Sequence, residues 1–168
     1  PPVINNTYYQ KIPLLNFSKG TSVFKTDDKE FTRGEDYFIT DAPSVAKLNA
    51  TEIIFAGYGI TDSTSGWDDY KNSDVSRKVI LILEGEPADK KGNSLIIKSA
   101  VKTSWSSMRS RKLQLARSKN PAMIVFVNAD FKSAYERYSK RLGYGILALD
   151  TADNSKNIPV IYLSRTAA

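Results

Sequence analysis

The side chains that could do chemistry in this chain are carboxylates, lysines, serines and tyrosines, because its 168 residues include neither histidine nor cysteine. That inventory excludes a Ser-His-Asp triad, a histidine-ligated zinc site and a thiol nucleophile. Two Ser-x-x-Lys sequences, at 44–47 and 99–102, would pair a serine with a lysine base only on a helix. Both fall in segments expected to be extended or loop, so the inventory predicts a non-catalytic chain. A hydrolase using carboxylates alone is the enzymatic alternative.

A cluster of acidic residues lies beside Gly66, with Asp62, Asp68, Asp69 and Asp74 falling within thirteen residues. Calcium prefers such oxygen ligands, but the residue order of an EF-hand loop is absent. Aspartate also favours turns, because its side chain accepts hydrogen bonds from nearby backbone amides. The cluster therefore predicts structural turns, with calcium at Asp62, Asp68 and Asp69 as the alternative.

Basic residues are concentrated between Lys98 and Arg141, where eleven basic and two acidic side chains give a net charge of +9, within a total of +6 for the chain. We expect helices in this segment to present basic side chains outward toward an acidic partner. The candidate binding residues are Arg109, Arg111, Lys112, Arg117, Arg137, Lys140 and Arg141. Two alternatives stay open: an ordinary solvated helix face, and a nucleic-acid surface in which interleaved aromatic side chains stack on bases. Those aromatic residues are Trp105, Phe131, Tyr135, Tyr138 and Tyr144.

Four continuous apolar runs, at 53–56, 79–83, 123–127 and 159–163, are typical of strands covered on both faces. Between them, the spacing of apolar residues predicts helices over 106–120 and 131–142, with Met108, Leu115 and Ala116 packed on the sheet. Short strands at 12–17, 21–25 and 37–40 are expected to form an antiparallel meander. No apolar run approaches the roughly 20 residues needed to span a bilayer.

Two short motifs carry a family resemblance. Gly57-Tyr58-Gly59 lacks the third glycine of a dinucleotide-binding fingerprint, so it predicts a turn. Trp67-Asp68-Asp69-Tyr70 follows a few residues later. Together with Asp74-Val75 and the run 78–85, these residues resemble the protease-associated (PA) domain of secreted di-zinc aminopeptidases related to glutamate carboxypeptidase and the transferrin receptor.

The resemblance implies an α+β chain with the swivelling β/β/α fold, in which mixed sheets form a partly open barrel or sandwich with about two helices. It divides a single domain, 1–168, into N-terminal strands (1–50) and a PA core (51–168). It further implies a non-catalytic substrate-access or protein-interaction module, part of a larger extracellular or periplasmic aminopeptidase. The expected partners are the catalytic domain of that protein, which would hold two zinc ions, and peptide substrate. No cofactor or metal is expected in this chain, and nucleic-acid binding through 98–141 is the alternative function.

Overall fold

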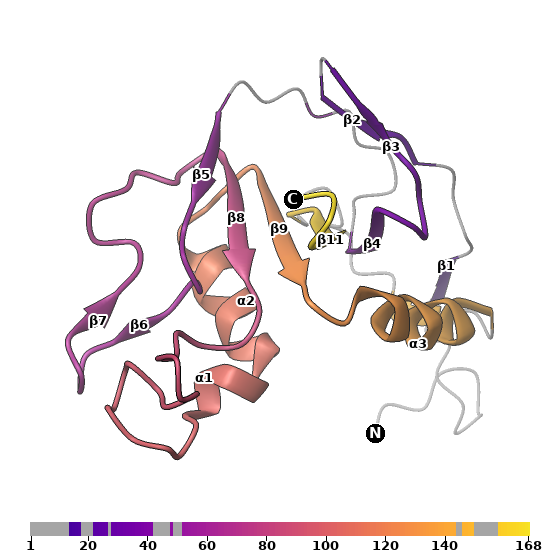
Figure 1. Ribbon diagram of the computed structural model, residues 1–168. Helices are drawn as coiled ribbons and strands as arrows, with labels where there is room; N and C mark the ends of the chain where they lie inside the picture. Colours follow the sequence, from indigo (N-terminus) through magenta and orange to yellow (C-terminus); the bar gives the residue numbers. More distant parts are fainter. Residues whose placement is uncertain are drawn as a thin grey trace, which may run out of the picture.

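The centre of the chain is an open five-stranded sheet with the strand order β4-β11-β9-β8-β5 (Figure 1). The structure is a computed structural model that describes residues 14–17, 22–26, 28–41, 48, 52–143, 146–149 and 158–168, with the backbone alone for 14–17, 141–143 and 146–149. The five strands are β4 (Tyr37–Asp41), β5 (Ile53–Phe55), β8 (Val79–Leu83), β9 (Met123–Asn128) and β11 (Val160–Ser164). Strands β5, β8, β9 and β11 run parallel, and β4 is antiparallel to β11.

The remaining elements are three helices and three antiparallel strand pairs, counted over the described residues. The helices are α1 (Ser104–Ser107), α2 (Arg109–Ser118) and α3 (Phe131–Gly143). The pairs are β1 (Leu14–Phe17) with β10 (Ile146–Leu149), β2 (Phe24–Lys25) with β3 (Glu30–Phe31), and β6 (Thr61–Asp62) with β7 (Trp67–Asp68). The predicted α+β class is confirmed. None of the described helices is long and apolar enough to cross a membrane.

Helices α2 and α3 cover one face of the sheet. Side chains of β8, β9 and β11 on this face, including Ile82 and Phe126, pack with Ala116 of α2 and Phe131 of α3. The ring of Tyr162 stacks on Phe126 at a centroid distance of 5.5 Å. Burial of these large side chains from water is the main stabilising contribution. The prediction that β8, β9 and β11 form the buried centre is confirmed.

The β2–β3 hairpin covers part of the opposite face. Phe24 and Phe31 stack at 4.9 Å and pack against a cluster that includes Tyr37 and Val125. Strand β5 lies at the sheet edge, where the side chains of Ile53 and Phe55 stay 60% and 59% exposed. The prediction that the apolar run 53–56 is covered on both faces is therefore wrong. An apolar run does not reveal whether its strand lies in the centre of a sheet or at its edge.

The expected antiparallel meander in the first fifty residues is also wrong. Strand β4 pairs with β11, and β1 pairs with β10, so both join strands from the other end of the chain. Within the described residues of this region, the antiparallel partners that lie close in sequence are β2 and β3. Local turn signals cannot indicate partners more than a hundred residues away.

The predicted helix 106–120 is divided at Met108, whose backbone (φ −88°, ψ 74°) separates α1 from α2. Thr103 begins α1, since its side chain accepts a hydrogen bond from the Trp105 amide at 3.2 Å. Met108 is 52% exposed, so its predicted packing on the sheet is wrong, whereas Ala116 is fully buried and Leu115 partly so. The second predicted helix, 131–142, is confirmed by α3.

Candidate functional site

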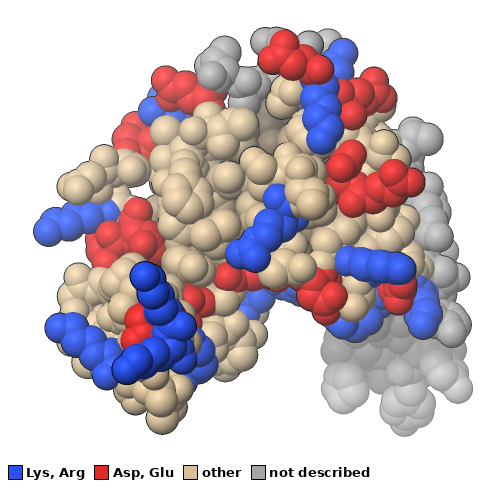
Figure 2. Space-filling model, viewed as in Figure 1, with Lys and Arg blue, Asp and Glu red and all other residues tan. Residues whose placement is uncertain are grey.

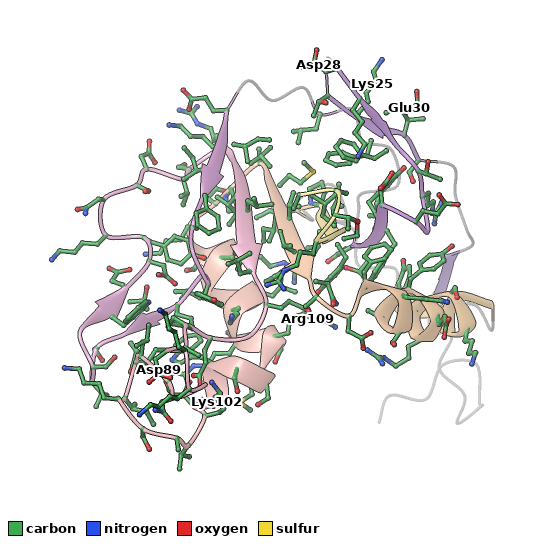
Figure 3. The ribbon with its side chains drawn as sticks, in the orientation of Figure 1. Lys25, Asp28, Glu30, Asp89, Lys102 and Arg109 are labelled. Carbon is green, nitrogen blue, oxygen red and sulfur yellow. The ribbon has the colours of Figure 1, made fainter. Side chains whose placement is uncertain are left out.

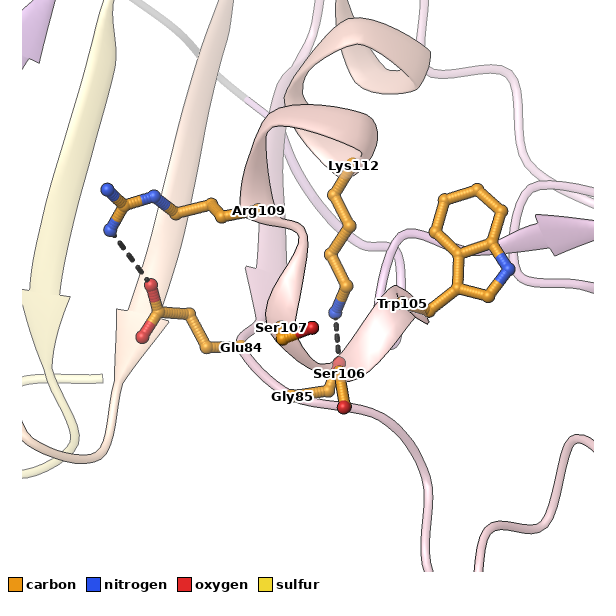
Figure 4. Close-up of a pocket in the computed structure, with 7 residues that line it drawn as sticks. All are labelled: Glu84, Gly85, Trp105, Ser106, Ser107, Arg109 and Lys112. Carbon is orange, nitrogen blue, oxygen red and sulfur yellow. Dashed lines mark hydrogen bonds and ion pairs between the residues drawn. The ribbon is translucent and has the colours of Figure 1, made fainter. Parts of the chain in front are cut away.

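The loops that follow β5, β8, β9 and β11 meet at one edge of the sheet, because parallel strands end at the same edge. Two adjoining clefts of about 290 and 280 Å³ lie there and share Glu84 and Gly85. The first is lined by Glu84, Gly85, Trp105, Ser106, Ser107, Arg109 and Lys112 (Figure 4). The second extends past Tyr58 to Asn128, Asp130 and Arg165. This edge brings together the charged residues best placed to act on a ligand.

Lys112 points from α2 into the first cleft, and the side chain is buried. Its Nζ donates to the carbonyl oxygens of Leu83, at 3.2 Å, and Gly85, and lies 5.5 Å from the Tyr58 ring centroid. Burial lowers the pKa of this amine to about 8. These carbonyls lie where β8 ends, so the ammonium ties the end of the strand to α2. The expectation that Lys112 faces outward is thus not met.

Glu86 is a second buried charge, and sequence reasoning did not identify it. Its side chain is 1% exposed and accepts hydrogen bonds from the Thr103 amide, at 3.1 and 3.2 Å, and from the Thr103 hydroxyl. Lys102 Nζ lies 4.0 Å from this carboxylate. The partner stands seventeen residues away, so no local pattern marks the contact. The contact closes the base of the loop between β8 and α1.

The two family motifs are joined by Asp69. Its carboxylate accepts hydrogen bonds from the amides of Tyr58 (3.1 Å) and Ile60 (3.0 Å), and from the indole nitrogen of Trp67 (3.0 Å). Gly57 has a φ of +49°, and a Cβ there would stand 2.8 Å from Asp69 Oδ1. The turn therefore requires glycine beside the carboxylate, and both motifs form one structural unit.

The neighbouring aspartates make separate turn contacts. Asp68 accepts from the Tyr70 amide (3.0 Å) and the Thr61 hydroxyl (2.8 Å), and these two hydrogen bonds, the backbone one foremost, lower its pKa. Asp62 accepts from the Ser65 hydroxyl at 2.8 Å, and Asp74 from the Ser76 amide at 3.1 Å. In the described parts of the chain, no three acidic side chains are grouped to hold a metal ion. The predicted structural turns are confirmed for Asp62, Asp68 and Asp74.

Tyr70, the last residue of the second motif, is buried beneath the glycine turn. A Cβ on Gly59 would stand 2.9 Å from Ile82 and 3.1 Å from the Tyr70 hydroxyl. Burial raises the pKa of this tyrosine well above its ordinary value, with Asp69 adding to the effect. Tyr70 is a packed core residue, and its hydroxyl keeps its proton at neutral pH.

The other predicted binding residues are divided among different contacts. Arg109 pairs with Glu84 (3.3 Å) and lies over the Tyr162 ring, while Arg111 stacks on Trp105 with 3.8 Å to the ring centroid. Arg117 pairs with Asp41. Arg137 and Lys140 are exposed on α3, and Arg141 belongs to the same helix, of which its backbone is described. The structure does not bring these residues together with Lys112 as one outward surface.

The aromatic residues of this segment serve the core. Trp105 and Phe131 are buried, and Tyr135 and Tyr138 lie partly buried against Phe38. Tyr144 lies outside the described residues. Trp105 and Phe131 are therefore too deeply buried for bases to stack on their rings.

The Ser-x-x-Lys sequences form no serine-lysine pair in the described residues. Lys102 Nζ donates to the Gly92 carbonyl at 2.7 Å, and Ser99 Oγ accepts from the Val101 amide at 3.2 Å. Ser44 and Lys47 lie outside the described residues.

No protein-family model matches the sequence, and no curated protein matches it either. The resemblance to the PA domain therefore depends on the two motifs and on how the chain uses them.

Proposed function

We propose that this chain is a PA-type module of an exported zinc-dependent aminopeptidase, acting without catalysis in substrate access or protein interaction. The observation that carries the proposal is the contact of Asp69 with both motifs. The residues that resemble the family are used together, in one hydrogen-bonded turn beside the clefts. That use supports a shared local structure and so favours the function that the resemblance implies.

The charged groups at the carboxyl edge also favour binding over catalysis. A general acid or base must reach a substrate proton and exchange it. Lys112, Glu86 and Asp69 instead have their polar atoms directed at backbone and capping groups of their own chain. The chain contains no histidine or cysteine, so the proposal assigns both zinc ions to the catalytic domain of the parent protein.

Exposed basic side chains supply the means of orienting the module on its partner. Arg137 and Lys140 lie exposed on α3, away from the Lys112 cleft residues. Complementary charges mainly accelerate encounter and fix orientation, and salt screens them. We therefore expect a salt-sensitive association with an acidic surface of the catalytic domain.

Calorimetric titration of the full chain against its separately expressed catalytic domain, at two salt concentrations, tests this function. We expect binding that weakens with salt and that weakens further in Arg137→Ala/Lys140→Ala. Lys25→Ala is the matched control, because this exposed lysine lies on the β2–β3 hairpin.

A short DNA duplex forms the second arm of the titration. Sub-micromolar binding to the duplex, with a log K against log salt slope of about −0.9 per phosphate contacted, would replace the proposal with the nucleic-acid alternative. Absence of binding to the catalytic domain would contradict the interaction role.

A further inference from the structure

The loop between β8 and α1, residues 87–102, exposes three aliphatic side chains. Leu95, Ile97 and Val101 are 43%, 46% and 67% exposed. Glu86 and Thr103, bound to each other, close the base of this loop. Several exposed aliphatic side chains on one short loop are typical of a contact surface.

The loop is held in one conformation by its own hydrogen bonds. The Asp89 carboxylate accepts from the amides of Lys91 and Asn93, both at 2.8 Å, and the Ser94 amide donates to the Ser99 carbonyl at 2.8 Å. Hydrogen bonds to Asp89, foremost from the Asn93 amide, lower its pKa. Ile96 is 5% exposed and packs with Ile60 and Trp105. Because Ile96 anchors the loop inward, the outward placement of its neighbours is built into the fold.

Four exposed lysines accompany the aliphatic residues. They are Lys90, Lys91, Lys98 and Lys102. Asp89 is the single acidic residue of 87–102, and its carboxylate is engaged by the loop itself. Basic side chains gather at the lower left of Figure 2, the region where Figure 3 places Lys102 and Asp89. The loop therefore carries both exposed positive charge and exposed aliphatic side chains.

The composition of the loop distinguishes between a protein and a lipid partner. Protein interfaces are enriched in arginine and depleted in lysine. Residues 87–102 contain no arginine, but four lysines and three exposed aliphatic side chains. Aliphatic burial among headgroups combined with lysine contacts is how proteins adhere to an anionic bilayer surface.

We propose that loop 87–102 docks this chain onto an anionic lipid surface, with Leu95, Ile97 and Val101 inserted between headgroups and Lys90, Lys91 and Lys98 contacting lipid phosphates. The docking goes beyond the proposed function and does not depend on it. It is an attachment at the surface of the bilayer and involves no spanning segment.

Co-sedimentation of the full chain with vesicles tests the proposal, using phosphatidylcholine alone and an equal mixture of phosphatidylcholine and phosphatidylglycerol. We expect binding to the mixed vesicles and little to the neutral ones. Leu95→Ser/Ile97→Ser should weaken binding about tenfold or more, because inserted methylenes are lost. Lys90→Ala/Lys91→Ala should also weaken binding about tenfold, since each lysine contributes near an anionic surface.

The chain offers matched controls for both variants. Ile53→Ser/Phe55→Ser removes two apolar side chains from β5 that are more exposed than Leu95 and Ile97, and Lys25→Ala removes a lysine at the opposite end of the view in Figure 3. Both should bind mixed vesicles like the unaltered chain. The proposal is overturned if Leu95→Ser/Ile97→Ser binds the mixed vesicles as tightly as the unaltered chain does, or if the unaltered chain does not bind them. It is also overturned if the chain uses this loop to bind the catalytic domain and binds no vesicle.

Discussion

Lysines have opposite roles in two neighbouring regions, the carboxyl edge of the sheet and loop 87–102. At the edge, Lys112 is buried and donates to two carbonyl oxygens of its own chain. In the loop, Lys90, Lys91 and Lys98 are exposed, and the backbone is held by other groups such as Asp89. The difference shows that the amine of Lys112 makes its contacts within the fold, whereas the exposed lysines of the loop are available to a partner.

The largest expected effect is that of Lys112→Ala. It removes the charged donor of the Leu83 and Gly85 carbonyls and the packing of the buried side-chain stem, so the free energy of unfolding should fall by about 4 kcal/mol. Lys98→Ala in the loop is the matched control and should change it by less than about 0.5 kcal/mol. Chemical denaturation of both variants measures the contrast, and equal losses would erase the distinction between the two regions.

Asp69→Ala tests the turn that joins the two motifs. Loss of its three hydrogen bonds should lower the free energy of unfolding by about 3 kcal/mol, at roughly 1 kcal/mol each. Asp69→Asn retains one carbonyl oxygen as an acceptor, so a smaller loss is expected in the same urea titration. If both variants are as stable as the unaltered chain, Asp69 does not hold the motifs together.

Ile96→Ala tests whether loop 87–102 is anchored. Removing a buried aliphatic side chain should cost about 2 to 3 kcal/mol of unfolding free energy, whereas Leu95→Ala should cost less than about 0.5 kcal/mol. Thermal unfolding of the pair would show the difference as a lower Tm for Ile96→Ala. An equal loss of Tm in the two variants would contradict the arrangement in which Ile96 points inward and Leu95 points outward.

A smaller effect is expected from pH, through Lys112. Its pKa is about 8 in the folded chain and ordinary, 10.5, in the unfolded one, so between these values the unfolded chain binds more protons. The free energy of unfolding should therefore rise by about 2 kcal/mol from pH 8 to 10, relative to Lys112→Met, which has no proton to lose. A difference between the two proteins that stays constant with pH would show that the amine keeps its ordinary pKa.

The sequence predicted those elements whose signal is local. Continuous apolar runs indicated β8, β9 and β11, and helical spacing indicated α3, because burial on both faces or on one stripe leaves a pattern in neighbouring residues. Asp62, Asp68 and Asp74 were also predicted correctly as turn residues, since each binds a group two or three residues away. Asp69, which binds amides nine and eleven residues away, was not.

The remaining features depend on contacts between distant residues. The pairing of β4 with β11 and the Glu86 contact with Thr103 join segments that no local pattern connects. Lys112 was expected outward because lysine usually is, but the carbonyls at the end of β8 provide acceptors that only the folded chain brings near. The exposure of Ile53 similarly follows from the place of β5 at the edge of the sheet.

An assay of the purified full chain tests most directly whether the charged residues at the carboxyl edge are structural and the module is non-catalytic. Hydrolysis of aminoacyl anilides and short peptides is measured with and without added zinc, in parallel with Lys112→Met. We expect no turnover above the buffer rate for either protein. Turnover by the unaltered chain that disappears in a folded Lys112→Met variant would contradict this expectation.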